Sequence, residues 1–474
     1  MRITEDFSTI LLAAGKGTRM KSPLPKVLHP VAGWPMISRV IDALNEVGAR
    51  QIRVVVGHGE ELVRQVVEPL GASAYKQDQQ LGTGHAVQCA EPQSLQGTVL
   101  IMNGDHPLIE ANDLRFMIKE FVNSQRKLSV VTAKVKKPGS FGRIVRHHGE
   151  LKAIVEAKDA SHETLKINEI NTGMYLVEAK FLNKLLPLLK NNNSQKEFYL
   201  TDIVSLAAEE GESVGTILSP SRVAFGVNSQ VELAKATKYI FKRKAKQLME
   251  QGVMIMDPDN TYIEDDVKIG AGTVVYPGNC LRAGTKIGKM CIIEPNSYLY
   301  KAQVSDAVHI KSQCYFEEVK IETKAVIGPF ARLRPGTIIG QEAKVGNFVE
   351  MKKVNFGAGA KASHLAYLGD AVIGDETNIG CGTITVNYAF DKKKYVTKVG
   401  KNVFVGSDTQ LIAPIEIGDN SFIAAGSTIT KSIPAGSMAV ARGRQVTKEN
   451  YKPKAPQNNE VKEEVKKPNV EIEG

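Results

Sequence analysis

The first half of the chain alternates short apolar runs with longer amphipathic segments, from Thr9 to about Val227. The apolar runs at 52–57, 98–105 and 127–135 predict buried strands, and the amphipathic segments at 36–48 and 112–123 predict helices. This alternation predicts an α/β, Rossmann-like domain with a mainly parallel sheet. We expect its ligands at the carboxyl ends of the strands.

The second half follows a period of six. Aliphatic residues recur at this spacing from Ile263 to Leu299, from Ile321 to Met351 and from Val399 to Ile429, and glycine often follows them. This period is typical of a parallel β-helix, in which each aliphatic side chain stacks inward on the next coil. The period breaks at 351–372 and at 379–399, where we expect loops that leave the wall and serve a site.

Between the two halves, residues 229–252 have a helical pattern that ends at Gly252. We therefore predict a first domain at 1–228, a linker helix at 229–252 and a β-helix domain at 253–447. The segment 448–474 is charged, contains proline and has few large apolar residues, which predicts disorder.

Composition limits the class of function. The formal net charge of +10 permits nucleic acid, anionic membranes or phosphorylated small molecules as partners. Aromatic residues make up only 6% and are not interleaved with basic ones, so we expect phosphorylated metabolites and no nucleic acid. No apolar run is long enough to enter a membrane, and the start MRITEDFS is not a secretory signal, so we expect a cytoplasmic protein. Five cysteines without a C-x-x-C pair argue against a disulfide framework and a zinc site.

The stretch ILLAAGKGTRM, residues 10–20, has the form of a phosphate-binding loop. An apolar strand is followed by Gly15 and Gly17, which let backbone N–H groups close around an anion. The spacing fits neither a Walker A loop nor a dinucleotide fingerprint. Asp105 ends another predicted strand, where it is either a ligand for a hard cation or a turn former.

The motifs LLAAGKGTRM…LPKVLH, QLGTGHA, EINTGMY and GVN, followed by RLRPG, GNFVEMKK, HLAYLGDA and VGSDTQ in the repeats, closely resemble the bifunctional GlmU family. In that family a glucosamine-1-phosphate acetyltransferase is joined to an N-acetylglucosamine-1-phosphate uridylyltransferase, and the product feeds peptidoglycan and lipopolysaccharide synthesis. The resemblance extends from about Ser8 to Arg442. It implies a left-handed β-helix with three hexads per turn, a homotrimer, Mg²⁺, and UTP and acetyl-CoA as substrates.

For uridylyl transfer, the resemblance implies that Arg19 and Lys26 bring positive charge to the triphosphate and that Asp105 and Asn228 hold Mg²⁺. The residues that match nucleotide- and sugar-binding positions are Leu12, Ala13, Ala14, Gly15, Lys26, Gln77, Gly82, Thr83, Asn103, Gly104, Asp105, Gly142, Glu156, Asn171 and Asn228. Asn103 stands where the family usually has tyrosine, and His106 where it has a small apolar residue.

For acetyl transfer, His364 matches the general base that takes a proton from the sugar amine. Arg334 and Lys352 match residues that hold the sugar 1-phosphate, and Tyr367 and Asn378 match sugar contacts. The residues that match acetyl-CoA contacts are Cys381, Asn387, Tyr388, Ser407, Ala425 and Arg442. The family usually has alanine at the position of Cys381, and NYDG where this chain has NYAF.

Three other functions fit parts of the sequence. A γ-type carbonic anhydrase needs three histidines, but the repeat half has only His309 and His364. A monofunctional sugar-1-phosphate nucleotidyltransferase with a structural β-helix remains the alternative, against which the HLAYLGD and GNFVEMKK motifs argue. A non-enzymatic binding scaffold would not need Arg19, Lys26 and Asp105 together.

Overall fold

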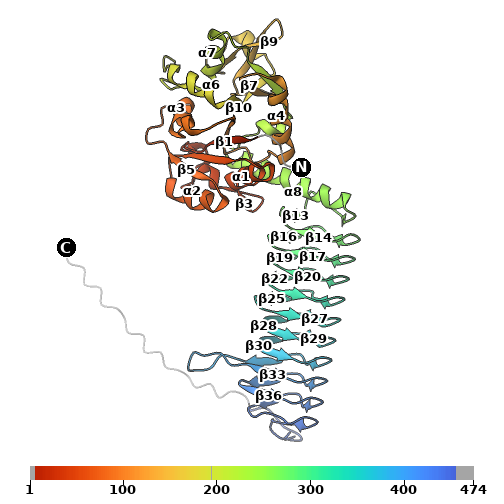
Figure 1. The fold of residues 1–474 in the computed structure, drawn as a ribbon. Coiled ribbons are helices and arrows are strands. Elements are labelled where there is room, and N and C mark those ends of the chain that lie inside the picture. The colour runs from red at the N-terminus through yellow and green to blue at the C-terminus, as the bar shows by residue number, and fades with distance from the viewer. Residues whose placement is uncertain (1–5, 194, 455–474) are drawn as a thin grey trace, which may run out of the picture.

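The computed structural model describes residues 6–193 and 195–454. A domain with a central sheet lies at one end, and a long column of stacked coils extends from it (Figure 1). Helix α8 (Gln230–Glu250) connects the two. Most of the tail predicted to be disordered, residues 455–474, lies outside the described residues. Within the described residues, no helix is long and apolar enough to cross a membrane.

The sheet of the first domain is mainly parallel, as predicted. Its strand order is β11-β7-β10-β6-β1-β4-β5, and only β10 runs antiparallel to its neighbours along this path. A hairpin of β8 and β9 extends it from β10. The bounds are β1 Phe7–Leu12, β4 Gln51–Val56, β5 Ser73–Lys76, β6 Thr98–Asn103, β7 Leu128–Lys134, β8 Arg143–His147, β9 Glu150–Val155, β10 Glu169–Glu178 and β11 Gly215–Leu218.

Helices bury their apolar sides against this sheet in two clusters. One cluster contains apolar residues of α1 and α4, and the other contains those of α3, α6 and α7. The predicted helices at 36–48 and 112–123 are therefore confirmed. The helix bounds are α1 Met36–Val47, α2 Glu60–Val67, α3 Thr83–Cys89, α4 Ala111–Ser124, α5 His162–Leu165, α6 Ala179–Leu185 and α7 Ile203–Glu209.

The second domain is a parallel β-helix built from short strands that pair with the strand one coil away. Every aliphatic residue of the predicted six-residue series is buried, which confirms the period. The strands that carry candidate site residues are β25 Arg332–Arg334, β27 Lys344–Asn347, β28 Glu350–Phe356, β29 Lys361–His364, β30 Tyr367–Ile373 and β31 Asn378–Ile379, followed by β32 Ile384–Val386 and β33 Thr397–Val399.

Only one of the two breaks in the period is a loop. The expectation of a loop at 351–372 is wrong, because β28, β29 and β30 run through this segment and each pairs with a strand one coil away. The inward positions continue there through Phe356, Ala362, Leu368 and Ile373, which are buried. The second break does contain a loop, residues 387–396, which projects from the wall between β32 and β33.

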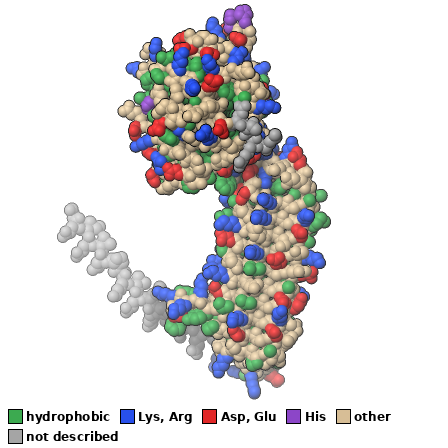
Figure 2. All heavy atoms as spheres, in the orientation of Figure 1, with side chains coloured by type: hydrophobic (Ala, Val, Ile, Leu, Met, Phe, Trp, Pro, Cys, Tyr) green, Lys and Arg blue, Asp and Glu red, His purple; other side chains and the backbone are tan. Residues whose placement is uncertain are grey.

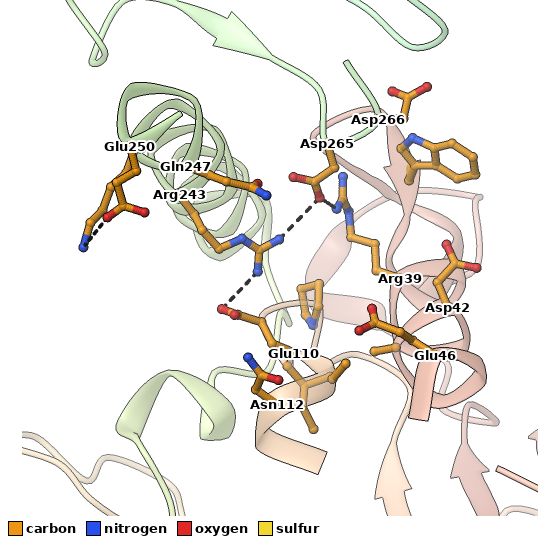
Figure 3. A pocket seen from close by; sticks show the side chains of 16 residues that line it. Arg39, Asp42, Glu46, Glu110, Asn112, Arg243, Gln247, Glu250, Asp265 and Asp266 are labelled. Carbon is orange, nitrogen blue, oxygen red and sulfur yellow. Dashed lines mark hydrogen bonds and ion pairs between the residues drawn. The ribbon is translucent and has the colours of Figure 1, made fainter. Parts of the chain in front are cut away.

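Helix α8 belongs to both domains. Ala236 and Ile240 pack in a core of the first domain, whereas Ala245 and Leu248 pack in the core of the β-helix. Arg243 forms ion pairs with Glu110 of the first domain and with Asp265 in the first coils of the β-helix (Figure 3). A cavity of about 890 Å³ lies at this joint. Helix α8 therefore contacts both domains.

Candidate functional site

The glycine loop after β1 lies at the carboxyl edge of the sheet. The backbone N–H of Gly104, after β6, donates to Leu12 O over 3.0 Å, which brings the ends of the two strands together. Gly17 has a φ of +60°, and a Cβ at this position would lie 2.7 Å from Lys26 Cβ. Glycine is therefore required here, because it allows the loop to fold back onto Lys26.

A cavity of about 240 Å³ opens beside this loop. It is lined by ten of the residues that the resemblance assigns to nucleotide and sugar binding. These are Leu12, Ala13, Ala14, Gly15, Lys26, Gln77, Gly82, Thr83, Asn103 and Asp105. Gln80, which sequence reasoning missed, also lines it and donates from Nε2 to Ala14 O over 2.6 Å.

Lys26 is the centre of a charged cluster at one end of this cavity. Its ammonium group forms an ion pair with Asp105 Oδ2 and donates to Asn228 Oδ1 over 3.1 Å. Arg19 donates to the same Asn228 oxygen over 3.0 Å. The four residues come from three distant parts of the chain, so the fold brings together all those proposed for triphosphate and metal binding.

Asp105 is buried, and its second oxygen is available. Among the residues that the structure describes, Oδ1 has no hydrogen-bond partner, and His106 Nε2 lies 3.5 Å from it. Burial alone would raise the pKa of Asp105, but Lys26 and His106 outweigh it and hold the pKa below its ordinary value. The carboxylate is therefore ionised at neutral pH. Burial, the largest effect, also lowers the pKa of His106.

These residues fit a hard divalent cation such as Mg²⁺. An ionised, buried carboxylate and an amide oxygen contact the same Lys26 ammonium group, and one carboxylate oxygen has no hydrogen-bond partner among the described residues. Mg²⁺ prefers oxygen ligands and retains several waters. Among the described residues, no group of three or more His, Cys, Asp or Glu side chains could hold a metal ion. The donor set thus suits a cation that shares its ligands with substrate phosphates.

A second cavity, of about 220 Å³, adjoins the first and shares Leu12, Thr83 and Asn103 with it. Glu156 and Asn171, both predicted sugar contacts, line it. Gly142 O accepts a hydrogen bond from Asn171 N over 2.9 Å, which places the third predicted sugar residue beside them.

The carboxyl group of Glu156 in this second cavity differs in pKa from that of Asp105. Burial, with Asp159 and Asp202 nearby, raises the pKa of Glu156 above its ordinary value. Glu197 lines both cavities and was missed by sequence reasoning. Asn103 lies against Gly173, where a Cβ would come 2.8 Å from its Nδ2. Asn103 therefore lines both cavities.

In the β-helix, His364 ends β29 on an exposed part of the wall. Its Nδ1 lies 2.7 Å from Oδ1 of Asn347, which ends the paired strand β27. A carbonyl oxygen can only accept, so Nδ1 donates and Nε2 carries the free lone pair that a general base needs. Asn347 was missed by sequence reasoning.

Three basic side chains gather around Lys352 in the β-helix. Arg334 on β25 and Lys352 on β28 occupy paired positions in neighbouring coils. Lys394, from the projecting loop, lies close to Lys352, and its positive charge, followed by that of Arg334, lowers the pKa of Lys352. Like charges held this close indicate an anion site. Lys394 is a further residue that the sequence did not identify.

The other two predicted acceptor contacts are Tyr367 and Asn378, and Tyr367 lies beside Asn387, a predicted acetyl-CoA contact. Tyr367 on β30 and Asn387 at the start of the loop meet over Gly369, where a Cβ would lie 2.6 Å from Tyr367 Oη and 2.8 Å from Asn387 Nδ2. Asn387 also donates to Asp370 Oδ2 over 2.5 Å. Asn378 lies on β31, the neighbour of β29.

Four of the six predicted acetyl-CoA residues lie in successive coils of the β-helix. Cys381 O accepts from Asp408 N over 2.6 Å, and Ser407 O accepts from Gly426 N over 2.8 Å, so Cys381, Ser407 and Ala425 occupy successive coils. Arg442 donates to Ala425 O over 3.0 Å and extends this series. Tyr388 is exposed on the loop. Cys381 is the exposed one among the five free cysteines.

Comparisons with known proteins agree with this division. Residues 9–172 match the MobA-like NTP transferase domain, residues 261–301 the hexapeptide repeat of succinyl-transferase, and residues 397–431 the bacterial transferase hexapeptide. Similar curated relatives are named "Bifunctional protein GlmU". The relative from Bdellovibrio bacteriovorus is 58% identical over 97% of this chain and 100% of its own, and that from Geotalea daltonii is 47% identical over 94% and 98%.

Proposed function

This chain belongs to the family of bifunctional GlmU enzymes, with acetyltransferase and uridylyltransferase activity, and we propose that each domain carries one of the two reactions. The observation that carries this assignment is the separation of two polar sites. Lys26, Asp105 and Asn228 meet in the first domain, whereas His364 and the cations around Lys352 lie in the β-helix. We place the domains at 1–228 and 253–447, with the linker helix at 229–252 between them.

The uridylyl site acts mainly by positioning and charge neutralisation. A phosphate oxygen of N-acetylglucosamine-1-phosphate, held near Glu156 and Asn171, attacks the α-phosphorus of UTP, and pyrophosphate leaves. Arg19 and Lys26 stabilise the negative charge that builds up on the phosphates. Asp105 and Asn228 would hold Mg²⁺, which would neutralise the phosphates further when bound.

The acetyl site activates the amine of glucosamine-1-phosphate. Arg334, Lys352 and Lys394 bind the phosphate and orient the sugar toward His364. As the amine attacks the thioester carbonyl of acetyl-CoA, His364 Nε2 takes its proton, and the C–S bond then breaks to release CoA. The N-acetylated product is the substrate of the first domain. Because UTP and acetyl-CoA are metabolites of the cytoplasm, we also assign the enzyme to that compartment.

Removal of divalent metal separates the two reactions. We expect a chelator to abolish pyrophosphate release, because Asp105 and Asn228 would lose their cation, while CoA release persists. Purified full-length protein is assayed for both products with and without EDTA, and excess Mg²⁺ serves as the control that restores the first reaction. Equal loss of both activities would contradict the assignment of the metal to the first domain.

We propose that the chain assembles as a homotrimer in which the acetyl site is completed at a contact between chains. Three apolar side chains, Phe330, Phe348 and Leu365, form an exposed ridge that passes beside His364, and the two phenylalanine rings stack at 5.3 Å. Exposed apolar surface of this kind marks interaction sites. In Figure 2, apolar and basic side chains also gather where the loop 387–396 projects from the column.

A charged residue introduced on this ridge is expected to dissociate the proposed trimer. Phe348→Asp should convert a particle with the mass of three chains into a smaller one, because a carboxylate cannot be buried without a partner. Sedimentation gives the mass, and acetyl transfer should fall while uridylyl transfer persists. Phe116→Asp, the same change at an exposed site on α4, is the matched control. A Phe348→Asp particle that keeps the mass of three chains would exclude the ridge from the interface.

A further inference from the structure

The side chain of Gln77 is fixed at the edge of the nucleotide cavity. Gln77 is buried and lines that cavity, and its Nε2 lies 3.1 Å from Gly82 O. A backbone carbonyl oxygen can only accept a hydrogen bond, so the group that faces Gly82 must be the NH₂ end of the amide. This contact determines the orientation of the amide.

His85 makes the second contact to the same nitrogen. Its Nδ1 lies 3.1 Å from Gln77 Nε2. Because Gln77 offers a donor here, Nδ1 must accept, and the imidazole proton must therefore be on Nε2. That nitrogen lies 3.8 Å from Cys89 Sγ, one turn further along α3. Burial, followed by the nearby Asp78, raises the pKa of Cys89, so the sulfur is a neutral thiol that can accept weakly.

These contacts use both protons of the Gln77 amide. One proton points to Gly82 O and the other to His85 Nδ1, and within the described part of the chain no hydrogen bond uses Gln77 Oε1. Gln77 therefore offers the cavity an acceptor. Uracil has an N3–H donor between its two carbonyl groups, whereas N3 of cytosine has a lone pair and would meet the oxygen with repulsion. An amide turned the other way would present a donor and lose the bond to Gly82.

We propose that His85 is a positioning residue which holds the Gln77 amide with its oxygen toward the base and thereby sets the preference of this site for a pyrimidine that carries N3–H. The proposal rests on the assignment of the cavity to the nucleotide. It adds a residue that does not line the cavity itself, and it gives that residue a defined protonation state: neutral, with the proton on Nε2.

The test compares two substitutions of His85 in the full-length enzyme. His85→Leu removes the acceptor at similar size, whereas His85→Asn can place its Oδ1 near the position of Nδ1. We measure kcat and KM with UTP and with CTP by pyrophosphate release, and CoA release serves as the control for folding and assembly. For His85→Leu we expect the ratio of kcat/KM for UTP over CTP to fall about tenfold, mainly through a higher KM for UTP, because one orienting hydrogen bond is lost. His85→Asn should restore most of the ratio.

The outcomes separate orientation from simple packing. A His85→Leu enzyme that retained the original UTP-to-CTP ratio would overturn the proposal, even if its melting temperature or kcat had fallen. If His85→Leu did not fold, a His85→Asn enzyme with lost selectivity would overturn it as well. Failure of the proposed function itself looks different, because the unsubstituted enzyme would then release no pyrophosphate from UTP.

Discussion

Replacement of His364 with alanine is expected to lower acetyl transfer by about 10²–10⁴-fold, the range for a lost general base. The structure supplies the physical reason. Asn347 Oδ1 accepts from Nδ1 over 2.7 Å, so the lone pair of Nε2 remains free on the exposed side of the wall. Without this base, the amine must lose its proton to water as it attacks the thioester.

The measurement is CoA release from acetyl-CoA with glucosamine-1-phosphate, alongside pyrophosphate release on the same preparation. The second activity should not change, since its site lies in the other domain. His309→Ala is the matched control, because His309 is the other histidine of the described β-helix and pairs with Glu294 at 2.7 Å instead of facing a candidate site. If His364→Ala kept its acetyl transfer, or if both activities fell together, the separation of the two sites would be wrong.

The fold could be predicted from the sequence because its two periods are local. Alternation of apolar strands and amphipathic helices gave the first domain, and the six-residue spacing gave the β-helix with its inward residues. The prediction of a loop at 351–372 was wrong for a physical reason. In this segment the small residue Ala362 takes an inward position, and a shorter side of the coil brings the next inward positions to Ile373. In the sequence, both features look like a break in the six-residue period.

The chemistry was harder to find where it depends on contacts between coils or strands. His364 and Asn347 are 17 residues apart, and Lys394 reaches Lys352 only because a loop leaves the wall after β32. The sequence spacing of one coil could have identified Asn347, because residues one coil apart stack on one another in the β-helix. No comparable period links Glu197 to Asn103, since those side chains meet through the tertiary packing of the first domain.

Asp105→Asn is expected to reduce uridylyl transfer by at least about 10²–10³-fold, the usual cost of losing one group that stabilises charge in a transition state. The amide has the same size as the carboxylate but no negative charge. It therefore weakens the hold on a divalent cation and breaks the ion pair that places Lys26 beside Asn228. Both groups that neutralise the phosphates are thus affected by a single substitution.

Two readouts distinguish this effect from misfolding. Pyrophosphate release should fall while CoA release persists, and calorimetric titration with Mn²⁺ should show weaker binding than in the unsubstituted enzyme. Asp42→Asn provides the same chemical change in the cavity at the domain joint and should leave both reactions intact. Unchanged Mn²⁺ affinity in Asp105→Asn would remove Asp105 from the metal site. A smaller loss of activity would then remain, because Lys26 would still lack the partner that holds it beside Asn228.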